Sequence, residues 1–385
     1  MNRAVFDLDG TLIADAGGIV IGEDPVPGSE EIGRDYKMYP GAYNALLDLK
    51  NAGYDLAAFS ERDDEDVRTM LKRTASTALF SRVFPSVTES GKPDLFRSLT
   101  GPEDYTVFVV MPGADQALAH GLGAEAVEVS YAMPEDPEED AKEAEGRAAE
   151  PHLFTAGTAE EMLDRIREAE VFSVLYRELV QKRKCRMIGI GGLDAAGEPR
   201  FTGRFAGYLG KAGQKTMVIH MSDYRNPPEV IAEIPDPIEG YFFNLYNYWK
   251  LIRLVLDPLK INKSLHVSVA CLDPDADAYD IHRQYDAEED TVVLIEGSTL
   301  FRQPLLEYLD AKVFLEIDFL ESIKRGLDRE DYKYDTEILK KYKELYIPVQ
   351  QRYKHDCRPE DICDIRIDYG NINRPVISEI RDMPS

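Results

Sequence analysis

Two aspartates lie two residues apart at the end of an apolar run near the N-terminus. The segment reads VFDLDGTLI, and a glycine and a threonine turn the chain directly after Asp7 and Asp9. At this spacing both carboxylates can face one pocket if the predicted strand ends there. One carboxylate can attack phosphorus, while the other protonates the leaving oxygen and later activates water. A divalent cation would let two anions approach a phosphate, so the pair predicts metal-assisted phosphoryl transfer.

Three more polar residues follow in the order that such a site requires. Ser60 ends the next apolar strand, LAAFS, Lys92 lies in ESGKPDLF, and Asp115 follows the apolar strand VFVVM. With the DxDGT segment, this series resembles the motifs of the haloacid dehalogenase (HAD) phosphatase superfamily. The resemblance implies that Asp7 is the nucleophile and Asp9 the general acid and base.

The same resemblance assigns the remaining roles. It implies that Ser60 and Lys92 hold the phosphoryl oxygens and that Mg²⁺ is held by Asp7, the backbone carbonyl of Asp9, and Asp115. One position departs from the family pattern, because Met111 stands where the first acidic residue of the metal-binding loop belongs. We therefore expect a weakened magnesium site. The short segment before Ser60 predicts a small cap or none, as in HAD proteins that accept bulky phosphates.

A second candidate site lies in the stretch GGLDAAGEP. Gly192 and Gly197 have the spacing of a phosphate-binding P-loop, in which backbone N–H groups, a lysine and a hydroxyl hold a polyphosphate. Here Glu198 and Pro199 occupy the lysine and hydroxyl positions. Glutamate would repel a polyphosphate, so the loop predicts a nucleotide-binding fold without efficient ATP-dependent transfer.

The sequence around this loop, over roughly residues 185–380, resembles the uridine kinase and phosphoribulokinase family. The segments that carry the resemblance are KTMVIHMSDYRNP, TVVLIEGS and the helical stretch that ends in GLDRE. The resemblance implies that Glu296 orients a magnesium-bound water and that Asp223 lies in the substrate loop. It also implies that Arg325 or Arg329 acts as a lid cation, with ATP or another nucleotide as the ligand.

The elements that must position these residues alternate between strand and helix in both halves of the chain. In the first half, strands at AVFDLD, YDLAAFS and YTVFVVM alternate with amphipathic helices, and the second half repeats the pattern from CRMIGIGG onward. Such alternation predicts α/β architecture with parallel sheets. We expect two domains, each a parallel sheet flanked by helices: a HAD-like Rossmannoid domain over residues 1–170 and a P-loop kinase-like domain over 171–385. Thr158 and Glu161 form a capping-box pattern at the start of the helix that contains the boundary.

Composition limits the function classes. The 385 residues carry a formal net charge of −26, which argues against nonspecific nucleic-acid binding, since such binding depends on basic residues, and leaves a local basic cleft open. No run of about 18 apolar residues offers a membrane span. The four cysteines are scattered and form no zinc pair, and no secretory signal is recognisable, so we expect a cytoplasmic protein. The expected ligand is a small phosphorylated metabolite, such as a nucleoside or sugar phosphate. The sequence leaves the formation of a homo-oligomer as an open alternative.

Three functions fit these patterns. The first is a Mg²⁺-dependent phosphatase that acts through an aspartyl-phosphate intermediate, joined to an impaired nucleoside or sugar kinase-like domain. The second is a bifunctional kinase and phosphatase that acts on a nucleoside, a sugar phosphate or a polynucleotide end. The third is a non-enzymatic scaffold or regulatory protein, in which both sites have decayed, one at Met111 and one at Glu198.

Overall fold

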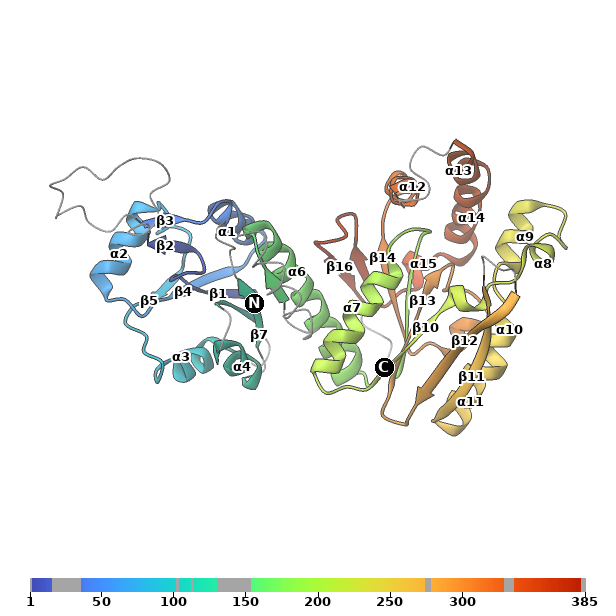
Figure 1. The fold of residues 1–385 in the computed structure, drawn as a ribbon, viewed down its shortest axis with the longest axis horizontal. Coiled ribbons are helices and arrows are strands. Elements are labelled where there is room, and N and C mark those ends of the chain that lie inside the picture. Colours follow the sequence, from blue (N-terminus) through green and yellow to red (C-terminus); the bar gives the residue numbers. More distant parts are fainter. Residues whose placement is uncertain are drawn as a thin grey trace. The chain divides into compact units, whose positions relative to one another are not determined.

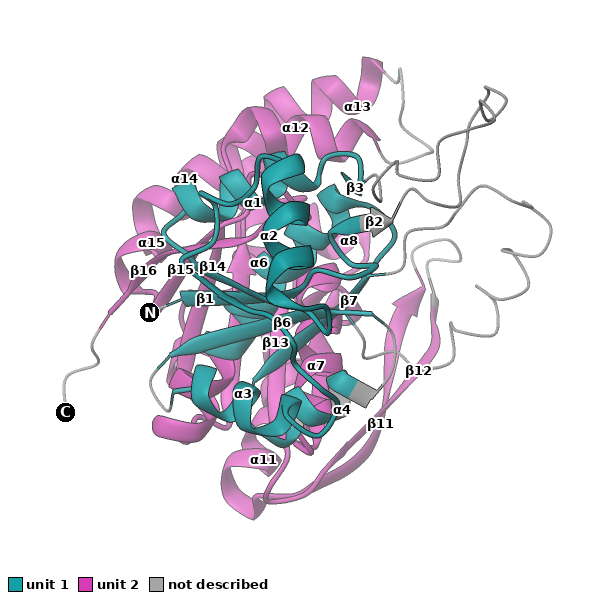
Figure 2. Ribbon diagram, turned by 90° about the vertical axis from the view of Figure 1, so that its left-hand side faces the viewer, with its two compact units in different colours: residues 1–174 teal, residues 175–385 magenta. Residues whose placement is uncertain are grey.

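The computed structural model describes residues 2–15, 36–101, 104–111, 114–122, 124–129, 154–273, 278–328 and 336–381. The chain separates into two compact units, Met1–Val174 and Leu175–Ser385 (Figure 2). The boundary expected at residue 170 falls inside helix α6 (Ala159–Leu175), the last element of the first unit. Arg329 lies outside the described residues.

Unit 1 is built on a six-stranded parallel sheet in the order β5-β4-β1-β6-β7-β8. The strands are β1 (Asn2–Asp7), β4 (Asp55–Phe59), β5 (Arg82–Phe84), β6 (Tyr105–Val110), β7 (Glu125–Val129) and β8 (Phe154–Ala156). A short antiparallel hairpin, β2 (Ile13–Asp15) and β3 (Tyr36–Met38), follows the first strand.

Helices cover both faces of this sheet (Figure 1). On one face lie α1 (Ala42–Asn51), α2 (Asp64–Arg73) and α6, and on the other lie α3 (Lys92–Leu99) and α4 (Ala114–Gly121). Successive residues of β1 therefore enter different cores: Phe6 packs with the first group of helices and Val5 with the second. A strand buried on both faces must be apolar at nearly every position, which explains the continuous run AVF.

Unit 2 contains a second six-stranded sheet in the order β10-β13-β9-β14-β15-β16. All pairs are parallel except the last, in which the edge strand β16 runs antiparallel to β15. The strands are β9 (Met187–Gly192), β10 (Thr216–His220), β13 (Val292–Ser298), β14 (Ala311–Glu316), β15 (Ile365–Asp368) and β16 (Val376–Ile380). The prediction of α/β architecture with parallel sheets is confirmed.

The helices of unit 2 that bear on the site are α7 and α12. Helix α7 (Glu198–Lys211) follows β9 directly, and α12 (Phe319–Asp328) follows β14. A long antiparallel hairpin, β11 (Leu265–Asp273) and β12 (Ala278–Ala287), extends from the second half of the unit. Further helices are α13 (Thr336–Lys341), α14 (Ile347–Cys357) and α15 (Pro359–Ile362).

The apolar and aromatic run over residues 241–259 has the length and pattern of one helix, but it does not form a single element. The chain instead forms α9 (Pro237–Asn244), α10 (Tyr248–Leu251), a π-helical turn (Ile252–Leu256) and α11 (Asp257–Asn262). The break falls at Asn247, whose side chain accepts a hydrogen bond from the backbone N–H of Lys250 at 2.9 Å. Asparagine is a strong N-cap residue, so it starts a new helix where the apolar pattern alone continues.

Within the described residues, no helix combines the length and the apolar character needed to cross a membrane.

Candidate functional site

The topology of unit 1 brings the predicted residues to one edge of the sheet. Asp7 ends β1, Ser60 follows β4, and α4, which carries Asp115, follows β6. Because β4, β1 and β6 are adjacent and parallel, their carboxyl ends meet at the same edge, where ligands bind in open α/β sheets.

The carboxylate of Asp9 is held through both of its oxygens. The fully buried Ser60 donates its hydroxyl to Asp9 Oδ2 at 2.5 Å, and Arg62 Nε lies 2.5 Å from Asp9 Oδ1. The backbone N–H of Arg62 in turn donates to Ser60 Oγ at 3.1 Å. Arg62 was not predicted from the sequence. These bonds fix the orientation of the Asp9 side chain.

Asp7 lies in an environment that disfavours its charge. Burial raises the pKa of its carboxyl to about 7, and the charges of Asp9 and Asp115 add to the effect. The backbone N–H of Asp9, which donates to Asp7 Oδ1 at 3.1 Å, and the charge of Lys92 act in the opposite direction. The three aspartates and the lysine are therefore close enough to influence one another. A further cation beside Asp7 would favour its ionised form.

Lys92 is a buried cation rather than a surface lysine, since only 5% of its surface is exposed. Its Nζ lies 3.0 Å from Asp115 Oδ2, 2.5 Å from Glu89 Oε1 and 3.3 Å from Glu61 Oε1. Burial opposes the charge, but the hydrogen bonds with Glu89 and Asp115 raise the pKa of the ammonium above its usual value. Lys92 therefore stays charged at any physiological pH.

The donor set of this edge suits a hard cation. Asp7 and Asp115 each have one carboxylate oxygen bound by a protein group, and among the described residues neither has a partner for the other oxygen. Within the same residues no group of three or more His, Cys, Asp or Glu side chains is arranged to hold a metal ion. Two carboxylates and a backbone carbonyl, completed by water, remain a sufficient set for Mg²⁺.

Met111 contributes no ligand of the kind that magnesium prefers. Its side chain is 49% exposed and lies against the turn at Gly10, where an added Cβ would be 2.5 Å from the sulfur. A thioether is a soft ligand, whereas Mg²⁺ prefers oxygen. The predicted small cap concerns the segment between Asp9 and Ser60, and residues 16–35 of that segment lie outside the described residues.

In unit 2, the carboxyl group of Glu198 occupies the inside of the P-loop-like turn. Gly197 adopts φ 100°, a conformation that favours glycine, at the start of α7. Glu198 is 4% exposed, and its Oε2 accepts the Gly197 N–H at 3.0 Å. Its Oε1 has no partner among the described residues and lies 3.2 Å from the position of a Cβ on Gly192. Burial raises the pKa of Glu198 to about 8, and the charge of Glu296 adds to this.

Side chains from the last third of the chain form hydrogen bonds with the loop between Gly192 and Gly197. Ser322 donates its hydroxyl to the carbonyl of Asp194 at 2.6 Å, and the Tyr342 hydroxyl donates to Asp194 Oδ2 at 2.9 Å. Arg325 donates to the carbonyls of Ala196 at 2.8 Å and of Tyr369 at 2.6 Å. The guanidinium expected to act as a lid cation thus binds backbone oxygens of the protein itself.

The other two predicted acids of unit 2 also have protein partners. Glu296, 3% exposed, lies 2.6 Å from His220 Nδ1, and this hydrogen bond raises the pKa of the imidazole. Asp223 accepts hydrogen bonds from Arg283 Nε and from the Tyr285 hydroxyl, both at 3.1 Å. The negative charge of Glu296 contributes to the raised pKa of Glu198, so Glu296 lies near the loop that contains Gly192 and Gly197. His220 was missed by the sequence analysis.

No protein-family profile and no curated protein sequence matches the chain. Solved structures match the chain, each over about half of its length. A possible uridine kinase from Bacillus stearothermophilus is 18% identical, and the match covers 52% of this chain and 97% of that one at a TM-score of 0.40. D-glycerate 3-kinase from Cryptococcus neoformans var. grubii is 12% identical, with 54% and 88% covered and a TM-score of 0.32. A HAD family hydrolase from Deinococcus radiodurans R1, with bound phosphate and sodium, is 18% identical, with 45% and 96% covered and a TM-score of 0.31.

The class that the coordinates define is an α/β protein of two units, each with a mainly parallel sheet flanked by helices. Kinases and HAD hydrolases are among the structures similar to it, each over about half of the chain.

Proposed function

We propose that unit 1 is a Mg²⁺-dependent, HAD-type phosphoric monoester hydrolase that acts through an aspartyl phosphate on Asp7. The observation that carries this proposal is the convergence of Asp7, Asp9, Ser60, Lys92 and Asp115 at one sheet edge, linked by hydrogen bonds and by mutual electrostatic effects. Such a combination of buried acids and a charged lysine is typical of catalytic sites.

The proposed reaction takes place in two steps. In the first, an oxygen of Asp7 forms a bond to phosphorus, the ester P–O bond breaks, and Asp9 gives its proton to the leaving oxygen. In the second, Asp9 removes a proton from water, the water oxygen attacks phosphorus, and the bond to Asp7 breaks. For this reaction the Ser60 hydroxyl turns from Asp9 to a phosphoryl oxygen, which frees Asp9 Oδ2 to carry the proton. The Lys92 ammonium exchanges an exposed carboxylate partner, Glu61 or Glu89, for another phosphoryl oxygen. Arg62 keeps the Asp9 carboxyl aligned with the leaving group.

Asp7, Asp115 and the backbone carbonyl of Asp9 would hold Mg²⁺, which would supply charge neutralisation for the anionic phosphate. Burial and neighbouring acids raise the pKa of Asp7, and a cation beside the carboxyl would favour its ionised, nucleophilic form. Since Met111 offers no oxygen, we expect weaker magnesium binding than a third carboxylate would give.

For unit 2, we propose a kinase-like domain without efficient ATP-dependent transfer. The supporting observation is Glu198, whose carboxyl fills the loop where a phosphate would bind and would repel it. The bifunctional alternative would need that carboxyl to move away. We further propose that the substrate of the protein is a small phosphorylated metabolite, such as a nucleoside or sugar phosphate, and that the protein acts in the cytoplasm.

Hydrolysis of p-nitrophenyl phosphate by the full chain, with and without Mg²⁺, tests the proposal. The Asp7→Asn variant should fall to the background rate, and Asp9→Asn should lose about 10²–10⁴-fold. Asp64→Asn, on the exposed side of α2, is the matched control and should keep full activity. Equal, magnesium-independent rates for all four proteins would refute the phosphatase assignment.

A further inference from the structure

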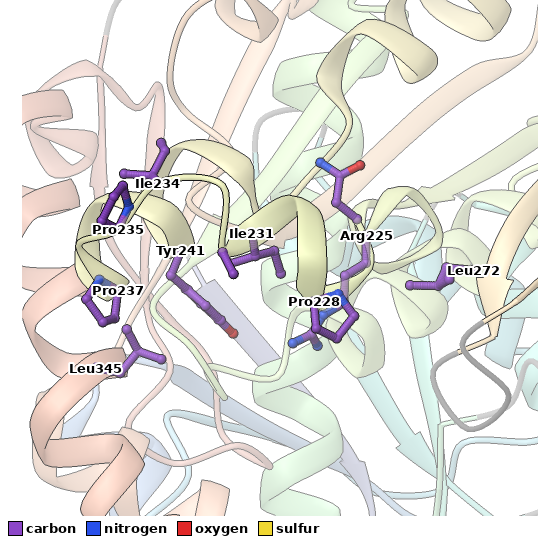
Figure 3. A pocket seen from close by; sticks show the side chains of 11 residues that line it. Arg225, Pro228, Ile231, Ile234, Pro235, Pro237, Tyr241, Leu272 and Leu345 are labelled. Atoms are coloured by element: carbon purple, nitrogen blue, oxygen red, sulfur yellow. The ribbon is translucent and has the colours of Figure 1, made fainter.

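Unit 2 contains a cavity of about 620 Å³ that involves none of the predicted site residues (Figure 3). Its walls come from α8 (Pro228–Ile231), the start of α9 and the loop between them, and they are apolar, with Ile231, Ile234 and Pro235 among them. The volume lies within the range of small-molecule sites, which are mostly apolar and carry a few placed polar groups.

Close packing of the two helices fixes these walls. A Cβ added to Gly240 would lie 2.4 Å from the carbonyl oxygen of Ile231, so only glycine lets α9 approach α8 this closely. The side chain of Asp236 caps α9 by accepting the N–H groups of Ile238 at 2.8 Å and Glu239 at 3.0 Å. The cavity is therefore a built feature of the fold rather than a gap between loosely placed segments.

Two polar side chains, Arg225 and Tyr241, line this mostly apolar cavity. Among the described residues, the guanidinium of Arg225 makes no hydrogen bond or ion pair, and the hydroxyl of Tyr241 makes no hydrogen bond. The two groups point toward the same part of the pocket (Figure 3). Burial raises the pKa of the Tyr241 hydroxyl, while the charge of Arg225 lowers it, which places the two groups within electrostatic reach of each other.

The acid nearest to Arg225 in sequence is already satisfied. Asp223 accepts hydrogen bonds from Arg283 and Tyr285, so it does not neutralise the cation that faces the pocket. Arginine pairs with carboxylates and phosphates through two parallel N–H donors, and a tyrosine hydroxyl can add a third bond.

We propose that this pocket binds a small organic anion with an apolar body. Its carboxylate or phosphate group pairs with Arg225 and accepts a hydrogen bond from Tyr241, and its apolar part packs against the isoleucines and prolines of the wall. The inference uses no residue of unit 1, so it stands or falls independently of the phosphatase proposal.

Calorimetric titration of the full chain with phenylacetate and with phenylphosphonate, which has no ester bond to hydrolyse, tests the proposal. Benzyl alcohol is the neutral probe of similar shape. We expect at least one anion to bind at least tenfold more tightly than benzyl alcohol. Arg225→Gln should weaken that binding at least tenfold, and Tyr241→Phe should weaken it a few-fold. Whichever anion binds more tightly identifies a carboxylate or a phosphate as the natural head group.

Phenylphosphonate can also bind at the sheet edge of unit 1. Binding at that edge is distinguished from binding in the pocket because Arg225→Gln weakens only the binding in the pocket. Far-ultraviolet circular dichroism reports whether each variant is folded. Arg225→Lys, which keeps the charge, provides a second variant and should retain part of the affinity if Arg225→Gln does not fold. Failure of both anions to bind, equal binding of benzyl alcohol, or binding that is indifferent to Arg225 would overturn the proposal.

Discussion

Replacing Asp7 by asparagine should stabilise unit 1 at alkaline pH. Burial and the neighbouring acids raise the pKa of this carboxyl from 3.8 to about 7. A group whose pKa is raised by folding contributes stability that is full below its unfolded pKa and is lost as the pH rises through its folded pKa. Between pH 4 and pH 8 the wild-type protein should therefore lose up to about 4 kcal/mol from this residue, at 1.36 kcal/mol per pKa unit.

The Asp7→Asn variant has no such loss, because asparagine has the same shape and its side-chain oxygen can still accept the N–H of Asp9. At pH 8 we expect the variant to be more stable than the wild type by about 2–4 kcal/mol. At pH 5 the difference should shrink by more than half. Asp64→Asn, at an exposed position, should change the stability by less than about 0.5 kcal/mol at both pH values.

Urea unfolding followed by circular dichroism, with EDTA present so that no divalent cation holds the carboxylate, measures this difference. Hydrogen–deuterium exchange read on peptides of residues 1–174 and 175–385 follows the two units separately, so the transition that Asp7→Asn moves can be assigned to unit 1. A variant that is no more stable than the wild type at pH 8, or a gain that does not depend on pH, would refute the argument that Asp7 is buried among like charges.

Three further substitutions test other parts of the structure. Arg62→Met removes a donor to the Asp9 carboxylate and should lower kcat of the proposed phosphatase reaction about 10–100-fold with little change in KM, which steady-state kinetics measures. Glu198→Lys removes the carboxyl from the loop and should give ATP binding by calorimetry where the wild type gives none; no binding by a folded variant would contradict the view that this carboxyl blocks the loop. Gly240→Ala should cost unit 2 about 1–3 kcal/mol, because its Cβ would lie 2.4 Å from a carbonyl oxygen, whereas Gly203→Ala, with open space around it, should not destabilise.

The sequence predicted the parallel sheets because the apolar runs are short, lie at regular intervals and alternate with amphipathic helices. It also predicted which residues meet in unit 1, since Asp7 and Ser60 directly follow buried strands that are adjacent in the sheet. What it missed depends on side-chain direction. Arg62 lies in a polar loop, and nothing in its type indicates that it turns back to Asp9.

In unit 2 as well, the sequence pattern did not predict where side chains point. The identity of Glu198 predicted repulsion of phosphate, but its place inside the loop follows from packing against Gly192, which no linear pattern encodes. The expected role of Arg325 rested on its position in the sequence, whereas in the structure its donors bind the carbonyls of Ala196 and Tyr369. These two contacts of Arg325 join residues more than forty positions apart, so periodicity and spacing carry no information about them.

Chemical trapping of the phosphorylated enzyme tests the central claim most directly. Borohydride reduces an acyl phosphate to an alcohol, so an aspartyl phosphate formed during turnover is converted to homoserine, which peptide mass spectrometry locates in the sequence. The account predicts homoserine at residue 7 in the wild type incubated with substrate and Mg²⁺, and none in the Asp7→Asn protein. An active enzyme that yields no homoserine at residue 7, or yields it at another aspartate, would contradict the account.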